Sequence, residues 1–314
     1  MSSFLLLITG FVFLYYGGEL LVRGSVVIAT RARISRLVVG MTVVSFATSS
    51  PELFVSLEAI FNESSDIVLG NIIGSNIANI ALVLGLTAIF FNVNISNKTL
   101  SLDYPFLLFS TLVVGFVLYF IGVISALIGF VFLLLLSCFL YYIIVESRQE
   151  NDNKTDVIEE ENNTSLLKSF LFLFFGAFLL KYGADFLVSS AIEISNHLNI
   201  EERIIAVTVM AIGTSIPELA TSIVAALRKE VDLAVGNIIG SNIFNLFAVL
   251  GFTAIFKNVK VINSHILSID YLSMLVLTLI FGVLIYFFTK GILNRKKGLL
   301  LVIIYTIYIY FTIQ

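Results

Sequence analysis

The stretch TVVSFATSSPEL at residues 42–53, followed by GNIIGSNIAN at 70–79, decides the fold of this chain because both segments occur twice. They return as TVMAIGTSIPEL at 208–219 and GNIIGSNIFN at 236–245, at a constant offset of 166 residues. Between residues 42–90 and 208–256, 26 of 49 aligned positions are identical. The identities include Pro-Glu pairs and runs of Gly, Asn and Ser inside apolar stretches, where polar groups are costly. Such a repeat in a membrane chain is typical of a transporter whose site lies between its two halves.

The composition is that of a membrane protein. Of the 314 residues, 59% are hydrophobic and 12% are charged, and the mean hydropathy is +1.04, which excludes an ordinary soluble domain. The net charge of −3 gives no support to nucleic-acid binding, and the one cysteine, Cys138, excludes a disulfide framework and a Cys-based metal site. Because the chain lacks a nucleophile pairing and a phosphate-binding Gly-rich loop, we expect neither an enzyme nor a cofactor.

Ten apolar stretches are long enough to cross a bilayer, so we predict an all-α membrane protein with ten transmembrane helices. The stretches are residues 4–28, 37–60, 67–91, 104–121, 123–145, 167–190, 203–227, 232–256, 267–289 and 298–313. Residues 146–168 are polar and acidic and predict a solvated linker. We therefore divide the chain into a first five-span repeat (1–145), the linker (146–168) and a second five-span repeat (169–314).

The distribution of Lys and Arg sets the predicted orientation. With the N-terminus outside, fourteen of these residues fall on inner loops and span ends and three on outer loops, as the positive-inside rule requires. Five spans per half is an odd number, so the second half enters the membrane inverted. The prediction is two inverted-topology five-helix repeats, a cytoplasmic linker and extracellular termini, an arrangement that permits alternating access.

Polar residues recur at helical spacing inside both copies of the repeat. In the first half they are Ser45, Thr48, Ser49, Glu52, Ser56, Asn71, Ser75 and Asn79. In the second half they are Thr214, Ser215, Glu218, Thr221, Ser222, Asn237, Ser241 and Asn245. Their hydroxyl, amide and carboxylate oxygens are the donors that hard cations such as Ca²⁺ and Na⁺ prefer. We expect the polar faces of the two halves to meet near the midplane.

Pro51 and Pro217 directly precede the two glutamates. A proline inside a helix removes the hydrogen bond to the carbonyl four residues back. The carbonyls around residues 45–47 and 211–213 then need other partners, and a cation site is one way to satisfy them. A kink that serves packing alone is the alternative.

The glycine pairs Gly70/Gly74 and Gly236/Gly240 are GxxxG motifs, which predict close helix approach, with Asn71 and Asn237 as interhelical hydrogen-bonding groups. Two further acids at repeat-related positions, Glu19 and Asp185, either attract cations at the two entrances or form plain salt bridges. Glu58 has no acidic counterpart in the second half, where Val224 occupies its position, so it is left out of the site.

At these residues the chain resembles the cation/Ca²⁺ exchanger superfamily, and most of all the prokaryotic members of its sodium/calcium exchanger branch. The two alpha-repeats of that family are matched by TVVSFATSSPE with GNIIGSNIAN and by TVMAIGTSIPE with GNIIGSNIFN. The resemblance covers essentially the whole chain. It implies a secondary active antiporter that exchanges Na⁺ for Ca²⁺ by alternating access, with the first and sixth spans sliding past an eight-helix core.

The resemblance also implies a set of ion ligands. Glu52 and Glu218 are similar to the two glutamates that form the central Ca²⁺ site. The other implied ligands, which offer hydroxyl, amide or backbone oxygens, are Thr48, Ser49, Thr214, Ser215, Ser75, Asn79, Ser241, Asn245, Ser45 and Ala211.

The first repeat departs from the family's usual G-T-S-L-P-E, because Ala47 replaces a glycine and Ser50 replaces a leucine. Asn245, where K⁺-dependent relatives carry Asp, argues against K⁺ dependence. The absence of an acid at Gly74, where proton-coupled relatives carry Glu, argues against proton coupling.

Charge arithmetic agrees with Na⁺/Ca²⁺ exchange. One Ca²⁺ neutralises two carboxylates, whereas three Na⁺ overshoot by one charge, so Ca²⁺ extrusion driven by Na⁺ entry is expected to be electrogenic. An H⁺/Ca²⁺ exchanger, a Na⁺ exchanger for Mn²⁺ or Mg²⁺ and, more remotely, a cation channel remain alternatives. We expect a multi-pass protein of a prokaryotic plasma membrane, with the lipid bilayer, Ca²⁺ and Na⁺ as partners. The oligomeric state stays open, a monomer included.

Overall fold

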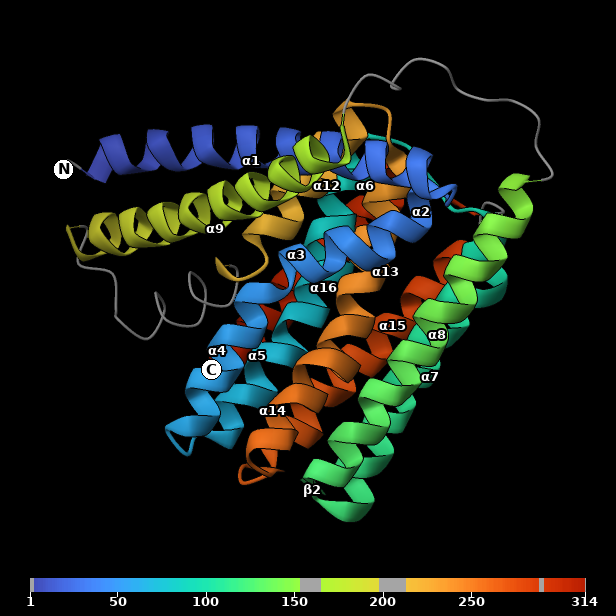
Figure 1. The fold of residues 1–314 in the computed structure, drawn as a ribbon. Helices are drawn as coiled ribbons and strands as arrows, with labels where there is room; N and C mark the ends of the chain where they lie inside the picture. The colour runs from blue at the N-terminus through green and yellow to red at the C-terminus, as the bar shows by residue number, and fades with distance from the viewer. Residues whose placement is uncertain (1–2, 153–164, 198–212, 288–290, 314) are drawn as a thin grey trace.

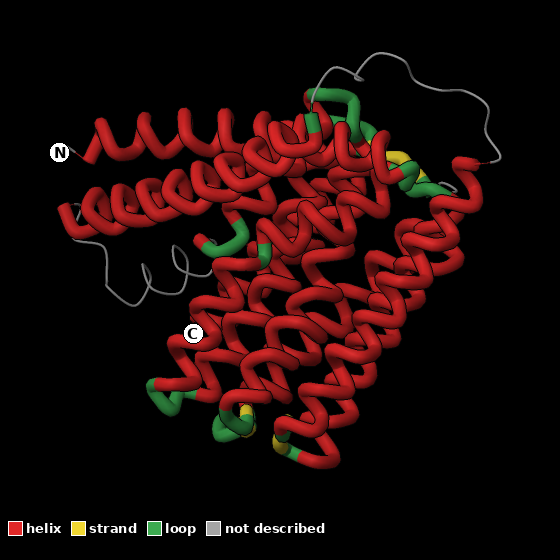
Figure 2. The backbone as a smooth tube through the Cα atoms, in the orientation of Figure 1, coloured by secondary structure: helices red, strands yellow, loops and turns green. Residues whose placement is uncertain are grey.

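The structure is a computed structural model that describes residues 3–152, 165–197, 213–287 and 291–313, and these are almost entirely helical (Figures 1 and 2). The first half contains α1 (Ser3–Ala32), α2 (Arg36–Val39), α3 (Ser45–Thr48), α4 (Ser50–Phe61), α5 (Ser65–Ala78), α6 (Leu84–Phe90), β1 (Val93–Asn94), α7 (Tyr104–Phe116), β2 (Val123–Ile124) and α8 (Ala126–Asp152). The second half contains α9 (Leu166–His197), α12 (Ile216–Leu227), α13 (Val231–Phe244), α14 (Leu250–Phe256), β3 (Val259–Lys260), α15 (Leu272–Tyr286), β4 (Ile292–Leu293) and α16 (Arg295–Ile313). Short π-helical segments continue several helices, at Gly40–Val44, Asn79–Val83, Thr99–Asp103, Val117–Ile121, Asn245–Val249 and Ile266–Tyr271.

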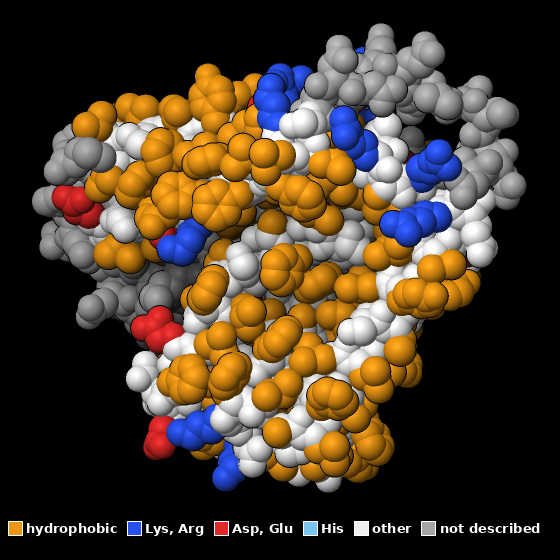
Figure 3. Space-filling view, in the orientation of Figure 1, with side chains coloured by type: hydrophobic (Ala, Val, Ile, Leu, Met, Phe, Trp, Pro, Cys, Tyr) orange, Lys and Arg blue, Asp and Glu red, His pale blue; other side chains and the backbone are white. Residues whose placement is uncertain are grey.

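The helices are those of a membrane protein. Within the described ranges, seven helices are long and apolar enough to cross a bilayer, and an eighth crossing results if the bent pair Arg36–Thr48 and Ser50–Phe61 is one span. Hydrophobic side chains cover much of the face in Figure 3, as expected of a surface that contacts lipid. The all-α membrane class is therefore confirmed, and the count of ten spans stays a prediction. Residues 153–164, the middle of the predicted linker, lie outside the described ranges.

Helices α1 and α9 lie side by side as a long pair at an angle to the rest of the bundle (Figure 1). A Cβ on Gly10 would lie 3.0 Å from the Gly183 carbonyl oxygen, and one on Gly17 would lie 2.9 Å from that of Gly176. One step further, a Cβ on Gly24 would lie 2.9 Å from the carbonyl oxygen of Ser169. Because contacts advance along α1 while they retreat along α9, the two helices are antiparallel. Small residues every seven positions let their backbones touch.

Contacts between the halves are reciprocal. The Tyr104 hydroxyl donates to the Thr278 carbonyl (3.2 Å), and the Tyr271 hydroxyl donates to the Thr111 carbonyl (2.9 Å). The short strands behave in the same way, since β1 pairs antiparallel with β4 and β2 pairs antiparallel with β3. Exchange of partners between matching positions is the pattern that a two-fold relation produces.

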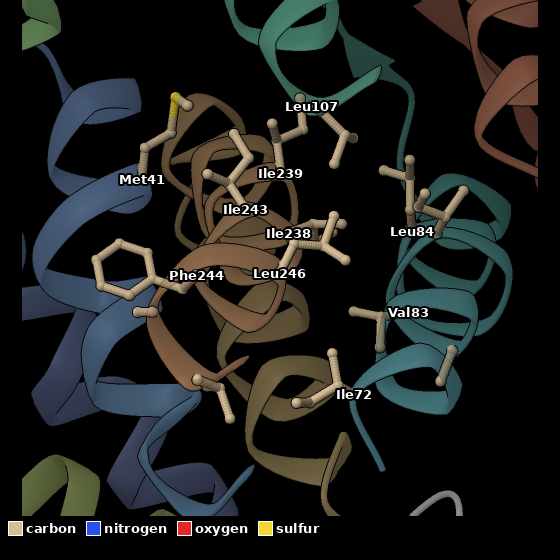
Figure 4. Close-up of a cluster of buried hydrophobic side chains, with 14 of the residues drawn as sticks. Met41, Ile72, Val83, Leu84, Leu107, Ile238, Ile239, Ile243, Phe244 and Leu246 are labelled. Atoms are coloured by element: carbon tan, nitrogen blue, oxygen red, sulfur yellow. The ribbon is translucent and has the colours of Figure 1, made fainter. Parts of the chain in front are cut away.

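The core is built around the second copy of the repeated segment. In an 18-residue window of the span Val231–Phe256, 89% of the residues are buried, against 28% in such a window of α8. Figure 4 shows side chains of α13, among them Ile238, Ile239 and Ile243, surrounded by residues of other helices such as Met41 and Leu107. The repeated segments are therefore central, and α8 faces outward.

The GxxxG prediction is confirmed for one half. A Cβ on Gly236 would clash with the Leu37 carbonyl oxygen, and one on Gly240 would lie 2.6 Å from the Cα atom of Met41. Apart from the backbone of their own helix, no described atom lies within 4 Å of a Cβ on Gly70 or Gly74. The repeat offset of 166 residues makes 203–211 the counterpart of 37–45, and these residues lie outside the described ranges.

Candidate ion-binding site

Pro51 lies at a helix break and not inside a continuous helix. Helix α3 ends at Thr48, Ser49 adopts φ −84° and ψ 3°, and α4 begins with Pro51 in its first turn, at a bend of 42°. A proline in the first turn costs no helical hydrogen bond of its own helix. It still leaves the Ala47 carbonyl without its usual donor, and the Ser50 hydroxyl donates to that oxygen instead (2.8 Å). The freed carbonyl of the first half is thus satisfied by a neighbouring side chain.

The second half has the same break without that cap. Ser215 adopts φ −88° and ψ 0°, and Pro217 lies in the first turn of α12. Pro217 has no N–H to donate to the Gly213 carbonyl, and Ile216, which takes the position of Ser50, has no hydroxyl. The predicted ligand Ala211 lies outside the described ranges.

The two predicted glutamates are the central feature of the site. Glu52 and Glu218 have no solvent exposure, and each lies in the first turn of its helix. Both carboxylate oxygens of Glu52 and the Oε2 atom of Glu218 have no hydrogen-bond partner among the described residues. The two carboxylates are close enough to interact electrostatically. Buried charges need a partner, and no described Lys, Arg or His forms an ion pair with either group, so the arrangement favours bound cations.

Hydroxyl groups from opposite halves meet beside these carboxylates. The Thr48 hydroxyl lies 3.3 Å from the Ser241 hydroxyl, and Ser75 lies 3.2 Å from Thr214, the repeat-related counterpart of that pair. The Ser49 hydroxyl points toward Glu218 Oε1 at 3.5 Å. The structure therefore brings together predicted ligands that are 139 to 193 positions apart in the chain.

Other predicted ligands are buried without a described partner. The Ser215 hydroxyl, both amide atoms of Asn79 and the Oδ1 atom of Asn245 belong to this group. Asn79 and Asn245 each open a π-helical segment, a local deformation that is frequent at functional sites. Unpaired buried oxygens of this kind are suited to complete the coordination of a hard cation.

Ser45 and the two helix-bridging asparagines serve contacts between helices. The Ser45 hydroxyl lies 2.7 Å from the Gly40 carbonyl and 3.0 Å from that of Asn237. The Ser45 carbonyl accepts the N–H of Ser49 (2.9 Å). Asn71 donates to Ser56 (3.0 Å) and to the Glu52 carbonyl (3.1 Å), while Asn237 accepts from Thr48 (3.0 Å). The predicted interhelical role of Asn71 and Asn237 is confirmed.

Asn76 and Asn242 are buried polar residues of the same region that lie outside the predicted polar faces. They occupy matching positions in the two GNIIGSN motifs and are at most 1% exposed. They lie one position after the serines of the selected stripe, so the i, i+4 spacing skipped them. Their identity in both copies was the available signal.

A cavity of about 330 Å³ reaches the site from one side. Its walls include Thr214 of the site and the charged side chains of Glu58, Lys181 and Asp185. The other lining residues are Pro51, Phe54, Val55, Ala184, Val188, Gly213 and Pro217. Lys181 and Asp185 form a salt bridge at 3.4 Å. At the other repeat-related position, Glu19 pairs with Arg23 at 2.7 Å and also binds Arg228. Both acids thus take part in salt bridges.

The site combines two carboxylates with neutral oxygens. Among the described residues, no group of three or more His, Cys, Asp and Glu side chains could hold a metal. Two carboxylates supplemented by neutral oxygens bind more weakly than a dense acidic cluster. Reversible binding is what transport requires.

Comparison with known proteins agrees with this geometry. The family model described as "Sodium/calcium exchanger protein" matches residues 2–145 and 168–314. The chain is 36% identical over 285 residues to "Inner membrane protein YrbG" of Escherichia coli, covering 89% of this chain and 87% of that protein. It is 28% identical over 348 residues to "Sodium/calcium exchanger MaX1" of Methanosarcina acetivorans, covering 98% and 97%.

A solved structure is similar over the whole length. It is the sodium-calcium exchanger NCX_Mj soaked with Na⁺ and Ca²⁺, with 28% identity and a TM-score of 0.82 over 99% of both chains. The similarity extends beyond the two repeated motifs to the complete fold.

Proposed function

The chain belongs to the sodium/calcium exchanger protein family, and on that premise we propose that this membrane antiporter exchanges Na⁺ for Ca²⁺ by alternating access. The observation that carries the proposal is the pair of buried carboxylates, Glu52 and Glu218, which lack a described cationic partner. Ca²⁺ neutralises this pair when it is bound. Na⁺ ions take its place when Ca²⁺ has left.

The proposed architecture is ten spans in two inverted halves, with both termini outside and residues 146–168 in the cytoplasm. The antiparallel contact of α1 with α9 supports inversion, since these helices open the two halves. The reciprocal hydrogen bonds of Tyr104 and Tyr271 support the same relation. With a central two-fold relation, sliding of the first and sixth spans past the remaining eight opens the same site to either side in turn.

The proposed ligands are the two carboxylates and the neutral oxygens around them. The pairs Thr48 with Ser241 and Thr214 with Ser75 bring hydroxyl groups from both halves to one place. The further proposed ligands are Ser49, Ser215, Asn79, Asn245, Ser45 and Ala211. Because most of these groups are neutral, the charge of the site is set by the two glutamates.

The charge of the site makes exchange electrogenic. Two carboxylates carry a nominal charge of −2, which one Ca²⁺ neutralises and three Na⁺ exceed by one. Each net charge moved across the membrane is driven by about 2.3 kcal/mol per 100 mV. The proposed direction is Ca²⁺ extrusion across a prokaryotic plasma membrane, driven by Na⁺ entry.

The test is ⁴⁵Ca²⁺ uptake into Na⁺-loaded proteoliposomes diluted into Na⁺-free buffer. Vesicles loaded with choline and vesicles loaded with acid are the controls. We expect uptake only with internal Na⁺, enhanced by an inside-positive potential. Uptake driven by the proton gradient alone would overturn the coupling ion, and uptake that needs no counter-ion would indicate a channel.

A further inference from the structure

We infer that Asn76 is a positioning residue that orients the amide of Asn245 so that its Oδ1 atom faces the ion site. The inference rests on the proposed ion site and adds a member that touches no ion itself. Asn76 lies in α5 of the first half, and Asn245 follows α13 of the second half. The contact therefore joins the two halves of the molecule.

A backbone carbonyl determines the orientation of the Asn76 amide. Its Nδ2 atom lies 3.2 Å from the backbone carbonyl oxygen of Asn242. A carbonyl oxygen can only accept a hydrogen bond, so the amide atom that faces it must be the NH₂ group. The Oδ1 atom of Asn76 must then point the other way.

The orientation of the Asn76 amide in turn determines that of the Asn245 amide. The Asn245 Nδ2 atom lies 3.1 Å from Asn76 Oδ1. Since Oδ1 is an acceptor, the facing atom of Asn245 must be its NH₂ group. The Asn245 Oδ1 atom is left buried and without a partner among the residues that the structure describes. One backbone carbonyl thus determines the orientation of two amides in succession.

Helix periodicity places Asn245 on the side of the ion site. Asn245 follows Ser241 by four residues, and residues at this spacing lie on one helix face. Ser241 approaches Thr48 at 3.3 Å, and the hydroxyls of both residues neighbour the Glu218 carboxylate. The orientation therefore presents an oxygen, and not an NH₂ group, to a cation.

The repeat-related arrangement is absent. By the repeat offset, Asn242 and Asn79 are the counterparts of Asn76 and Asn245. Both are fully buried, and all four of their amide atoms lack a partner in the described part of the chain. The amide of Asn79 is therefore free to turn toward an ion, while the amide of Asn245 is held by Asn76 before an ion binds. Holding a ligand in its bound orientation raises affinity because less freedom is lost on binding.

A double-mutant cycle tests the inference. Asn76→Leu keeps the branched shape and the number of heavy atoms of the side chain and removes both hydrogen bonds, and Asn245→Ala removes the oriented oxygen. We expect Asn76→Leu to raise the KM for Ca²⁺ and Na⁺ about five- to tenfold, with a smaller effect on kcat. In the Asn245→Ala background, the same substitution should change KM by less than about twofold, because the group that it orients is gone.

The matched control is Asn242→Leu, which alters a side chain without a described partner. The cycle of Asn242→Leu with Asn245→Ala should be additive. If Asn76→Leu does not reconstitute, Asn76→Ala serves in the same cycle. Additive effects of Asn76 and Asn245 would overturn the inference and assign Asn76 to helix packing.

Failure of the inference is separable from failure of the proposed function. The cycle uses the KM of whichever cation the wild-type protein carries, so it can be read even if protons replace Na⁺. Loss of Na⁺-dependent Ca²⁺ uptake in the wild-type protein would overturn the proposed function alone. An additive cycle in an active exchanger would overturn the inference alone.

Discussion

Around Pro51 and around Pro217 the same break in a helix has two different outcomes. At Pro51, the hydroxyl of Ser50 donates to the Ala47 carbonyl at 2.8 Å. At Pro217, Ile216 has no hydroxyl, and Gly213 lines the 330 Å³ cavity beside Thr214. Two repeat-related segments, identical at 7 of 12 positions, therefore offer different oxygens. We propose that the second half provides the more available backbone ligands.

The largest effect is expected at the two buried glutamates, which occupy matching positions in the two halves. Glu52→Gln and Glu218→Gln each remove one of the two charges that balance Ca²⁺. Loss of one partner of a buried charge cluster costs about 3–5 kcal/mol, so transport should fall by at least about 100-fold in each variant. The measurement is ⁴⁵Ca²⁺ flux at matched protein density. Wild-type flux in either variant would contradict the assignment of the site.

The next prediction compares alanine substitutions of two glycines at matching positions in the two halves. A Cβ on Gly240 would lie 2.6 Å from the Cα atom of Met41, whereas, apart from the backbone of its own helix, no described atom lies within 4 Å of a Cβ on Gly74. Gly240→Ala should therefore destabilise the fold by about 1–3 kcal/mol. The residues that correspond to the Met41 segment, 203–211, lie outside the described ranges, so the two-fold relation of the halves predicts a similar loss of stability for Gly74→Ala. Thermal unfolding followed by circular dichroism compares the two variants, and a melting temperature left unchanged by Gly74→Ala would contradict the equivalence of the two halves.

A smaller effect is expected when the hydroxyl of Ser50, which donates to the Ala47 carbonyl, is reproduced in the second half. Ile216→Ser places a hydroxyl where Ser50 lies, so that it can donate to the Gly213 carbonyl. If that carbonyl is an ion ligand, the KM for Ca²⁺ should rise about fivefold, the worth of one hydrogen bond. Ile216→Val, which adds no hydroxyl, is the control and should leave KM unchanged. An equal KM for both variants would show that the two kinks are equivalent for the ion.

The smallest effect belongs to an exposed pair between the halves. The Lys257 ammonium lies 2.9 Å from Glu63 and, by this hydrogen bond and its charge, holds the pKa of the Glu63 carboxyl below its usual value. A lowered pKa in the folded state stabilises the fold above the unfolded value, and the contribution is lost as pH falls through the folded value. Wild type and Glu63→Gln should differ slightly in melting temperature at pH 7 and converge below about pH 4. A difference that persists at pH 3 would contradict this reading.

Much of the site followed from periodicity in the sequence. The spacing of Thr48, Ser49 and Glu52 predicted one polar face, and the repeat predicted its counterpart around Glu218. The structure brings these faces together, with Thr48 beside Ser241 and Ser75 beside Thr214. Such pairs could be anticipated because a duplicated polar face inside a membrane has few other places to go.

The missed features depend on how the two halves are placed against each other. Asn76 falls outside the i, i+4 stripe, and its contact with Asn245 requires the relative position of α5 and α13. The glycine contacts of α1 with α9 likewise depend on an antiparallel register that no local pattern specifies. The cap of Ala47 by Ser50 could have been foreseen, since a hydroxyl just before a proline is well placed to replace the missing donor.

The central claim is that Na⁺ and Ca²⁺ bind in turn to the buried site formed by Glu52 and Glu218. Isothermal titration calorimetry of the purified protein with Ca²⁺, at increasing Na⁺ concentrations, tests this claim most directly. We predict that Na⁺ weakens Ca²⁺ binding progressively and that Glu218→Gln abolishes the binding. Ca²⁺ binding that is unchanged by Na⁺, or that survives in Glu218→Gln, would contradict the claim.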